Sequence, residues 1–471
     1  WAFCSPANIG FAGILSGDFM PEALDMLGLL TGERSSCQPV AWRLGKSIGH
    51  GEFLARVRAW RELLRRVSGH AFALHIRDSV EFASALFGAW QAGKTIYLPG
   101  DTLPATCANI RQTVDGYLGE FAPEWAPMAP LAQDTMAPAG DFHHLDPDSV
   151  GLVLYTSGST GAPQGIPKKL SQMSAEIATL EMQFGDLLGA ADIMATVSHQ
   201  HIYGLLFKVL WPLTAGRAIH AASVSFIEEL TAAPAQRDFL LVSSPAHLKR
   251  FPENPAWAVA SNRLRAVFSS GGPLTLEVAR ETERVLGLLP IEVYGSSETG
   301  GIAWRQQHEQ ASEVWTPFPG VRWRVEQEEG VLEVRSPNLP DEEWFRTADQ
   351  VAPAGDGFLL KGRIDRIAKI EDKRISLSAI ETRLTALPMV TDARVVVIEG
   401  GRQRVAAFVV PSADGRRKLA RIGKLRFNRM LRDTLSRSVD PLGLPRIWRY
   451  LDALPTNAQS KTAYAELMAL L

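Results

Sequence analysis

Residues Leu154-Tyr-Thr-Ser-Gly-Ser-Thr-Gly-Ala-Pro-Gln-Gly165 decide how the rest of the chain is interpreted. The stretch holds three glycines and four serine or threonine hydroxyls, between a strand predicted at 150–154 and a helix predicted from about Ser171. Such a loop frees backbone N–H groups to surround an anion, and its hydroxyls add donors and metal ligands. The common NTP-binding loop closes on Gly-Lys-Ser/Thr, whereas Gly161 is followed here by Ala-Pro-Gln-Gly. The sequence therefore predicts an anion-binding loop of another kind, the alternative being a glycine- and serine-rich surface turn.

Short apolar segments alternate with helical ones on both sides of this loop. Strands are predicted at 71–76, 95–98, 238–242, 264–269 and 291–294, with helices at 81–92 and 274–288. Alternating apolar and charged residues at 315–334 predict antiparallel strands. Repeated strand–helix alternation favours largely parallel sheets covered by helices, so the expected fold class is α/β.

The pattern changes near Asp365. Residues 364–375 alternate, 377–387 are predicted as a helix, and 394–398 and 405–410 as strands, which makes a small α+β unit. Residues 416–437 then hold nine basic residues against the single acidic residue Asp433, a local charge of +8. Such a run is usually a solvated helix face. The alternative is a docking surface for an acidic partner.

Composition and charge narrow the class of protein. With 471 residues, 46% hydrophobic and 21% charged, the chain has ample core, and more than one domain is expected. A net charge of −2 argues against nucleic-acid binding, and no apolar run has membrane-spanning length. Cys4, Cys37 and Cys107 are odd in number and scattered, which favours reduced thiols in a cytoplasmic protein.

Five further segments carry motifs, and they occur at 269–274 (Ser-Ser-Gly-Gly-Pro-Leu), 293–300 (Val-Tyr-Gly-Ser-Ser-Glu-Thr-Gly), 344–349 (Trp-Phe-Arg-Thr-Ala-Asp), 362–365 (Gly-Arg-Ile-Asp) and 454–461 (Leu-Pro-Thr-Asn-Ala-Gln-Ser-Lys). With the loop, they resemble the adenylate-forming enzymes: acyl-CoA synthetases, aryl-acid ligases, luciferases and adenylation domains. The resemblance covers about residues 71–461. It implies a large N-terminal domain (1–364) of mixed, largely parallel sheets with helix cover and a small β-barrel-like subdomain. A small mobile α+β domain (365–471) is expected to follow and to carry the catalytic lysine.

The resemblance also assigns roles to individual residues. The phosphates of ATP are expected at Thr156, Ser157, Gly158, Ser159, Thr160 and Gly161. The adenine and the α-phosphate are expected at Gly272, Pro273, Tyr294, Gly295, Ser296 and Thr299, the ribose at Asp349, and the ribose or a phosphate at Arg363. Mg²⁺ is expected at Glu298 and Thr160. The implied catalytic residues are Lys461, Thr160, Glu298 and His201, and the implied hinge is Asp365.

The chemistry of these side chains agrees with their roles. The ring of Tyr294 can stack on a purine, and a carboxylate such as Glu298 beside a triphosphate needs a hard cation that takes oxygen ligands. The carboxylate of Asp349 can accept two hydrogen bonds from the ribose diol. Lys461 would place an ammonium where negative charge concentrates in the transition state. Taken singly, Gly-Ser-Ser-Glu could instead be a helix cap and Lys461 a solvated lysine.

Four positions depart from the family pattern. The family usually has Lys at Gln164 and Gly at Ala348, Asp372 and Ser460. The methyl group of Ala348 matters only if the backbone there needs a positive φ. Asp372 stands in a loop that lines the thiol's tunnel in relatives, and Lys168 or Lys169 is a candidate substitute for the missing loop lysine.

Residues 198–204 (Ser-His-Gln-His-Ile-Tyr-Gly) resemble the segment whose histidine or aromatic residue flanks the acyl pocket, and His201 aligns with it. The alternative is a histidine packed at the start of a helix. This region, through Trp211-Pro, is also similar to bacterial ligases that load an aromatic starter acid onto an acyl-carrier protein for aryl-polyene pigments.

These features predict an ATP-dependent, AMP-forming ligase for a small aryl or fatty acid. The acyl-adenylate would pass to a phosphopantetheine thiol, of an acidic acyl-carrier protein in preference to CoA because of the basic run at 416–437. One alternative is a nucleotide-binding regulatory protein that has lost catalysis, to which the four departures point. Another is an adenylating enzyme whose acceptor is an amine or an oxygen.

Overall fold

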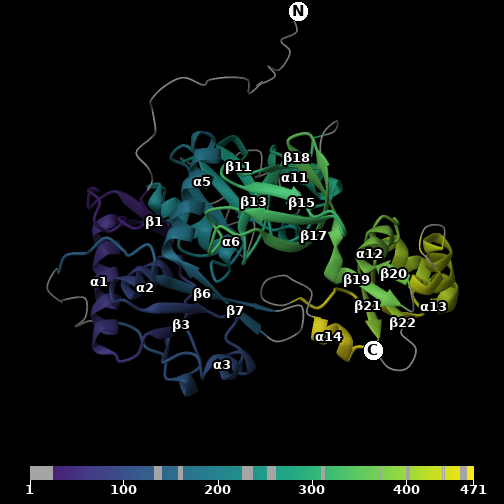
Figure 1. Cartoon of the computed structure of the whole chain (residues 1–471), viewed down its shortest axis with the longest axis horizontal. Coiled ribbons are helices and arrows are strands. Elements are labelled where there is room, and N and C mark those ends of the chain that lie inside the picture. Colours follow the sequence, from purple (N-terminus) through teal and green to yellow (C-terminus); the bar gives the residue numbers. More distant parts are fainter. Residues whose placement is uncertain are drawn as a thin grey trace, which may run out of the picture.

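The computed structural model describes residues 25–131, 140–157, 163–224, 237–251, 261–308, 313–370, 373–398, 404–436, 439, 441–456 and 464–471. Two large sheets are built before residue 365 and two small sheets after it. Figure 1 shows the purple, blue and teal elements on the left and the small yellow-green unit on the right. Within the described ranges, no helix combines the length and the apolar character needed to cross a membrane.

The first sheet has five strands in the order β5-β3-β4-β6-β7. Strands β3 to β6 are parallel, and β7 runs antiparallel to β6. The elements of this region are α1 (His50–Arg66), β3 (Ala71–His75), α2 (Ser79–Gln91), β4 (Thr95–Leu98), α3 (Pro104–Ile110), β5 (Gly116–Gly119), the 3₁₀ turn Pro123–Trp125, β6 (Val150–Ser157) and β7 (Pro163–Lys169). The strand–helix–strand order predicted for residues 71–98 is therefore confirmed.

The second sheet has thirteen strands in the order β2-β1-β9-β8-β10-β11-β12-β13-β14-β18-β17-β16-β15. Its parallel half, with the hairpin partner β2, consists of β1 (Pro39–Arg43), β2 (Lys46–Gly49), β8 (Asp192–Ala195), β9 (Ile219–His220), β10 (Phe239–Ser243), β11 (Leu264–Ser269) and β12 (Ile291–Ser296). Its helices are α5 (Leu170–Leu188), α6 (Ile202–Gly204), the π-helical segment Leu205–Leu210, α7 (Trp211–Thr214), α9 (Pro245–Leu248), the 3₁₀ turn Ser261–Arg263 and α11 (Leu276–Leu286).

From β12 onward the same sheet is antiparallel, as the alternation at 315–334 predicts. This half consists of β13 (Gly300–Arg305), β14 (Val314–Pro317), β15 (Arg322–Val325), β16 (Val331–Arg335), β17 (Phe345–Ala354) and β18 (Gly357–Arg363). A separate apolar cluster, which includes Trp315, Leu332 and Phe358, packs within this half.

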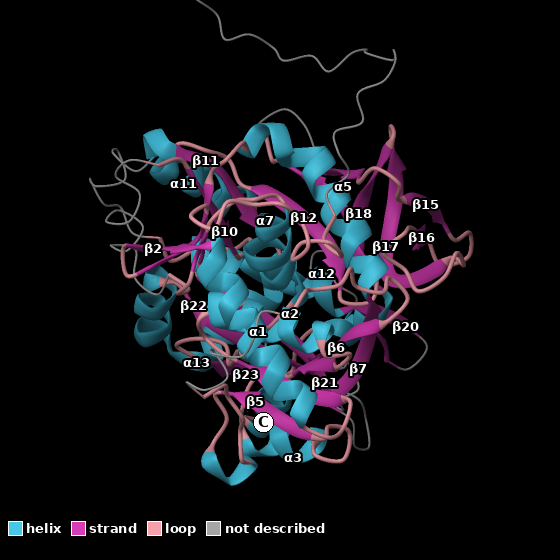
Figure 2. Cartoon of the chain, turned by 90° about the vertical axis from the view of Figure 1, so that its left-hand side faces the viewer, coloured by secondary structure: helices cyan, strands magenta, loops and turns pink. Residues whose placement is uncertain are grey.

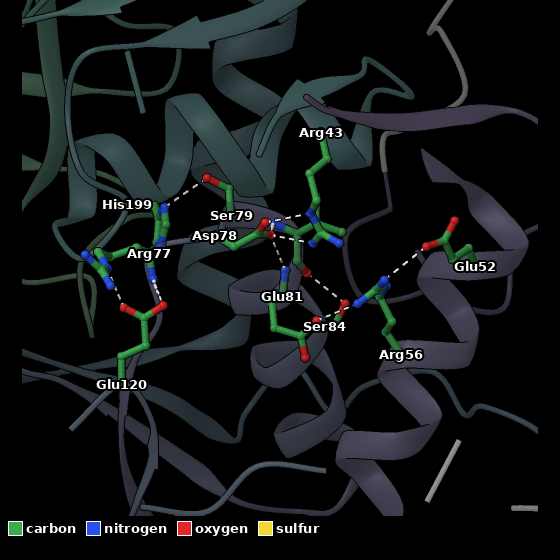
Figure 3. A network of polar contacts seen from close by, with 11 residues as sticks. Arg43, Glu52, Arg56, Arg77, Asp78, Ser79, Glu81, Ser84, Glu120 and His199 are labelled. Atoms are coloured by element: carbon green, nitrogen blue, oxygen red, sulfur yellow. Dashed lines mark hydrogen bonds and ion pairs between the residues drawn. The ribbon is translucent and has the colours of Figure 1, made fainter. Parts of the chain in front are cut away.

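Helix α2 lies between the two large sheets, where it touches β3 and β4 of one sheet and β9 of the other. This position explains why all but one of its residues are buried. Figure 2 shows α1, α2 and α7 in the middle of the molecule with strands around them. The helix begins where the Asp78 carboxylate accepts hydrogen bonds from the N–H groups of Val80 and Glu81, and Arg43 of β1 holds the same carboxylate at 2.7 and 2.8 Å (Figure 3). Capping and the ion pair together fix α2 against the second sheet.

The region after residue 365 has cores of its own. Its elements are β19 (Ile367–Ile370), β20 (Lys373–Ser376), α12 (Leu377–Thr385), β21 (Val390–Ile398), β22 (Arg404–Pro411), α13 (Ala413–Leu435), the 3₁₀ turn Pro441–Gly443, β23 (Ile447–Tyr450) and α14 (Tyr464–Ala469). Helices α12 and α13 cover one face of the sheet β21-β22-β23, and Leu454 and Leu467 pack on the other. Gly423, with φ +75°, breaks the helical backbone of α13.

The two cysteines that lie in the described ranges, Cys37 and Cys107, are free thiols, as the cysteine count predicts. Cys4 lies outside the described residues.

Candidate functional site

The glycine-rich stretch sits at the tip of a β-hairpin. The sequence predicts a loop from residue 154 to 165, but β6 continues to Ser157 and β7 begins at Pro163, so the unpaired part is shorter. The prediction of the loop's length is therefore wrong, because backbone pairing such as Thr156 with Gln164 extends the strands into the polar sequence. Helix α5 begins at Leu170, close to the predicted Ser171. Gly158, Ser159, Thr160 and Gly161 lie outside the described residues.

The second motif forms a tight turn between β12 and β13. The hydroxyls of Ser296 and Thr299 lie 3.1 Å apart, and each also bonds the other's backbone N–H. The Thr299 hydroxyl donates to the carbonyl of Gly300 as well. Glu298 lies in this turn and is half-buried. The turn therefore presents Glu298 on a short, internally bonded piece of backbone.

Gly295 is required by this geometry. A Cβ at this position would lie 2.2 Å from the carbonyl oxygen of Gly300 on the facing strand. A side chain would therefore push β12 and β13 apart beside Glu298, which explains the glycine at 295 by close backbone approach.

Tyr294, Asp349 and Arg363 meet although they come from three strands. The Tyr294 hydroxyl donates to Asp349 Oδ2 at 2.8 Å, and Arg363 Nη1 lies 3.6 Å from Asp349 Oδ1. Burial raises the pKa of Tyr294, and the neighbouring Asp349 charge raises it further. Tyr294 therefore stays protonated and donates. The residues predicted at the base and at the ribose thus form one cluster, which the register of β17 and β18 creates by pairing Asp349 with Arg363.

The short motif at 269–274 is tied to the same place. The Ser270 hydroxyl donates to the carbonyl of Val293 at 2.7 Å, next to Tyr294. Gly271 has φ +86°, so the chain turns back at a position that favours glycine. Gly272 and Pro273 follow and are exposed. The turn therefore lies beside the strand that carries Tyr294.

The two histidines of residues 198–204 have different environments. His199 is buried: its Nε2 lies 2.7 Å from the carbonyl of Ile76, and its Nδ1 lies 3.1 Å from the Ser79 hydroxyl (Figure 3). Burial, and then the charge of Lys208, lower the pKa of His199 well below its usual value, so it is a neutral structural histidine. His201 stands at the N-cap position of α6 and is half-buried. The alternative raised for His201, a histidine packed at the start of a helix, therefore agrees with its place at the N-cap of α6, and its role beside an acyl pocket stays a prediction.

A buried polar network lies under the turn that carries Glu298, and the sequence reasoning did not find it as a unit. Lys168 Nζ donates to the carbonyl of Glu298 at 2.7 Å and to that of Asn338 at 3.3 Å. Gln172 Nε2 donates to the same Asn338 carbonyl at 2.8 Å, and Glu176 Oε1 accepts the N–H of Gly301 at 2.7 Å. Gln172 and Glu176, four residues apart on α5 and therefore on one face of this helix, are the part of the network that the sequence could have revealed.

The lysine substitutes considered for Gln164 do not supply a free cation. Lys168 is 3% exposed and its ammonium is used on backbone carbonyls. Lys169 is directed to Asp148, at 3.4 Å. Gln164 itself is paired in β7. Ala348 is not among the described non-glycine residues with positive φ, so the added methyl group causes no backbone strain there.

The predicted hinge lies in the 3₁₀ turn Ile364–Arg366, immediately after β18. Arg366 pairs with the buried Glu381 of α12 and donates to the carbonyl of Val395 at 3.1 Å, so the chain is fixed to the small unit from Arg366 onward. Asp372, Ser460 and Lys461 lie outside the described residues.

The residues near the turn suit a metal that is bound together with phosphates. Within the described ranges, no group of three histidine, cysteine or acidic residues could hold a metal ion. A single half-buried carboxylate, Glu298, fits Mg²⁺ bound through one carboxylate, substrate phosphates and water.

Residues 103–348 match the family described as AMP-binding enzyme. A 4-coumarate–CoA ligase of Rhodobacter capsulatus is 30% identical over 327 residues, which are 67% of this chain and 75% of that protein. Pyochelin synthetase PchE of Pseudomonas aeruginosa is 28% identical over 309 residues, which are 57% of this chain and 21% of that protein. Among solved structures, ATP-bound MatB from Rhodopseudomonas palustris superposes with a TM-score of 0.77 at 19% identity. That match covers 95% of this chain and 99% of MatB, so the fold is shared.

Proposed function

Because this chain belongs to the AMP-binding enzyme family, we propose that it is an ATP-dependent, AMP-forming ligase that joins a carboxylic acid to a phosphopantetheine thiol. The observation that carries the proposal is the cluster of Tyr294, Asp349 and Arg363. Tyr294 lies on β12, and Glu298 lies in the turn that follows this strand. Four motifs far apart in the sequence thus meet at one end of β12. An aromatic ring, a carboxylate and a guanidinium together suit a purine, a ribose diol and a phosphate.

In the proposed first step, an oxygen of the acid attacks the α-phosphorus in line, and pyrophosphate leaves. The loop around Thr156 to Gly161 would surround the phosphates, Glu298 and Thr160 would hold Mg²⁺, and Lys461 would neutralise the charge that develops. Mg²⁺, when bound, supplies positive charge between the phosphate oxygens. In the second step a thiol sulfur attacks the acyl carbon and AMP leaves. The rate comes mainly from positioning and electrostatics.

We further propose that residues 1–364 and 365–471 are the two domains and that Asp365 is the pivot between them. The separate apolar clusters on the two sides of this position support the division. The anchoring of Arg366 to α12 supports a pivot that ends just before it. Rotation of the small domain would move Lys461 away from the nucleotide site and bring the face that contains β19 and β20 to it.

The proposed acid is aromatic. The 4-coumarate–CoA ligase among the relatives supports this class, and so do the rings of Tyr203 and Phe207, which lie 4.9 Å apart just after His201. The test is ATP–pyrophosphate exchange with a panel of aryl and fatty acids. Exchange with aryl acids supports the proposal, and exchange with fatty acids alone corrects the acid. A complete lack of acid-dependent exchange would favour a regulatory nucleotide-binding protein. Product analysis with and without CoA identifies an amine or oxygen acceptor.

For the acceptor, an acidic carrier protein is favoured over free CoA. Helix α13 presents six exposed basic residues: Arg416, Arg417, Arg421, Lys424, Arg426 and Arg429. Arg437, the last of the predicted run, lies outside the described residues. Long-range attraction would speed the docking of an acidic protein, whereas a small molecule needs few cations. Figure 1 shows α13 at the end of the molecule remote from β3 and β6, so delivery of the thiol would require the small domain to turn.

Reversing three of these charges should slow acyl transfer to a carrier protein and flatten its salt dependence. Arg421→Glu, Lys424→Glu and Arg426→Glu remove the attraction around the break at Gly423, while adenylation lies elsewhere. Stopped-flow or single-turnover transfer at several salt concentrations measures both effects. The matched control reverses three exposed cations of the large domain, at Lys46, Arg111 and Arg322, with the same change in net charge. Equal transfer rates in the two triple variants would show that α13 is only a solvated surface.

Asp349→Ala should weaken ATP binding while the fold is retained. Loss of hydrogen bonds to a charged acceptor costs about 1.5–3 kcal/mol, or roughly ten- to a hundredfold in Kd. Because Asp349 also accepts from Tyr294, Tyr294→Phe is the control, which keeps the ring and removes only the hydroxyl. Titration calorimetry gives Kd, and thermal unfolding gives Tm. An unchanged ATP affinity with a much lower Tm would assign Asp349 to structure alone.

A further inference from the structure

Lys168 links the hairpin of the glycine-rich stretch to the turn that carries Glu298. It lies on β7, the strand that leaves the glycine-rich loop, and its ammonium reaches the backbone carbonyl of Glu298 itself. The other end of the same turn is held from α5, where Glu176 accepts the N–H of Gly301. All these contacts are made by side chains less than 10% exposed. The backbone of residues 298–301 is thus fixed at both ends to the segment that follows the loop.

Gln172 and Asn338 complete the connection. The Asn338 carbonyl accepts from both Lys168 and Gln172, and its side-chain amide donates to the carbonyl of Gly301 at 3.3 Å. Burial lowers the pKa of Lys168, while the carboxylates of Glu176 and Glu298 oppose that change. A buried lysine is costly unless its charge is compensated and hydrogen-bonded. This one donates to two backbone carbonyls, and the charges of Glu176 and Glu298 favour its ionised form.

We propose that Lys168 is a positioning residue for the metal-binding carboxylate: it fixes the backbone of Glu298 to β7 and α5, so that the Glu298 carboxylate is held in place for Mg²⁺. The inference rests on the proposed function, because it takes Glu298 as the Mg²⁺ ligand. Lys168 is buried and its ammonium donates to backbone carbonyls, which distinguishes it from a replacement for the loop lysine that is absent at Gln164. Residues that orient metal ligands typically change metal affinity when they are replaced.

The test compares ATP binding with and without metal. Lys168→Met keeps the length and the apolar stem but removes the ammonium. Calorimetry should show that the Kd of ATP rises about tenfold or more in the presence of Mg²⁺ and is unchanged in EDTA. In exchange assays, the Mg²⁺ concentration for half-maximal rate should rise with it. If this variant does not fold, Lys168→Gln replaces it, because glutamine is polar but too short to reach the carbonyl. The same Mg²⁺-dependent rise in the Kd of ATP is expected.

The matched control is Lys94→Met. Lys94 Nζ also donates to two backbone carbonyls, those of Val67 and Gly69, in the same large domain but in the first sheet's α2–β4 connection. Its replacement should lower Tm without changing the difference between ATP binding in Mg²⁺ and in EDTA. The proposal is overturned if Lys168→Met lowers only Tm, or if it weakens ATP binding equally with and without Mg²⁺. A wild-type protein that binds MgATP but shows no acid-dependent exchange would instead count against the proposed function.

Discussion

Lys461→Ala should abolish the formation of acyl-adenylate and spare the second half-reaction. The proposed ammonium acts only where charge develops at the α-phosphate, so its loss removes a contact made in the transition state. Loss of one such contact costs about 3–4 kcal/mol, or roughly a few hundredfold in rate. ATP–pyrophosphate exchange measures the first step. Transfer from a supplied acyl-adenylate to the thiol measures the second and serves as the internal control.

Thermal unfolding of wild type and variant separates a folding defect from a catalytic one. The segment that carries Lys461 is bracketed by Leu454 and Leu467, which are buried in the same apolar cluster of the small domain. ATP–pyrophosphate exchange at a near-normal rate in the variant would contradict the catalytic role proposed for Lys461. Equal loss of both half-reactions would point to a general defect instead of a role at the phosphate.

Much of the fold could be predicted because it follows from the periodicity of apolar residues over short stretches of the sequence. The apolar strands at 71–75, 239–243 and 264–269 and the antiparallel region from β14 to β16 follow from periodicity alone. The glycine-rich stretch was harder. Its hydroxyl residues suggest a loop, yet pairing between Thr156 and Gln164 extends both strands into it. Ladder formation with a neighbouring strand overrode the local preference of these residues.

The contacts within the site depend on register and on long-range approach, which one sequence does not reveal. Tyr294 and Asp349 are 55 residues apart and meet although β13 and β14 stand between β12 and the β17–β18 pair in the sheet order. Lys168 was considered a substitute cation for the phosphates, but its place on β7 directs it beneath the turn to the carbonyl of Glu298. A motif therefore predicts which residues lie in the site, whereas packing determines which partner each side chain contacts.

Lys208→Met should stabilise the protein at neutral pH, and the gain should shrink as the pH is raised toward 10. Lys208 lies in the π-helical segment Leu205–Leu210 and is fully buried, with Nζ donating to the Ser223 hydroxyl at 2.8 Å. Burial lowers its pKa to about 7, opposed by the charge of Asp78. Burial, and in addition the positive charge of Lys208, lower the pKa values of His199 and His220. The chain therefore retains a lysine whose ionised form is unfavourable in the folded state.

The sign of the pH dependence follows from proton binding. Between the folded pKa of about 7 and the ordinary lysine pKa of 10.5, the unfolded chain holds more protons at this site, so stability rises with pH. Below pH 7 both states are protonated and the full cost is present; above 10.5 neither is charged and the cost disappears. Each unit of difference between the two pKa values corresponds to about 1.4 kcal/mol. The buried ammonium of Lys208 therefore lowers the free energy of unfolding by roughly 4–5 kcal/mol.

Methionine removes this cost and one hydrogen bond worth about 1 kcal/mol. The Ser223 hydroxyl keeps the carbonyl of Val197 as an acceptor, at 3.4 Å, so no new buried polar group is left unpaired. Thermal unfolding of wild type and variant at pH 6.5, 8 and 9.5 measures the effect, with the exposed Lys46→Met as the control. The variant's excess in Tm should be largest at pH 6.5 and smallest at 9.5. A lower Tm for Lys208→Met at every pH would show instead that the Lys208 ammonium is held by interactions stronger than its burial penalty.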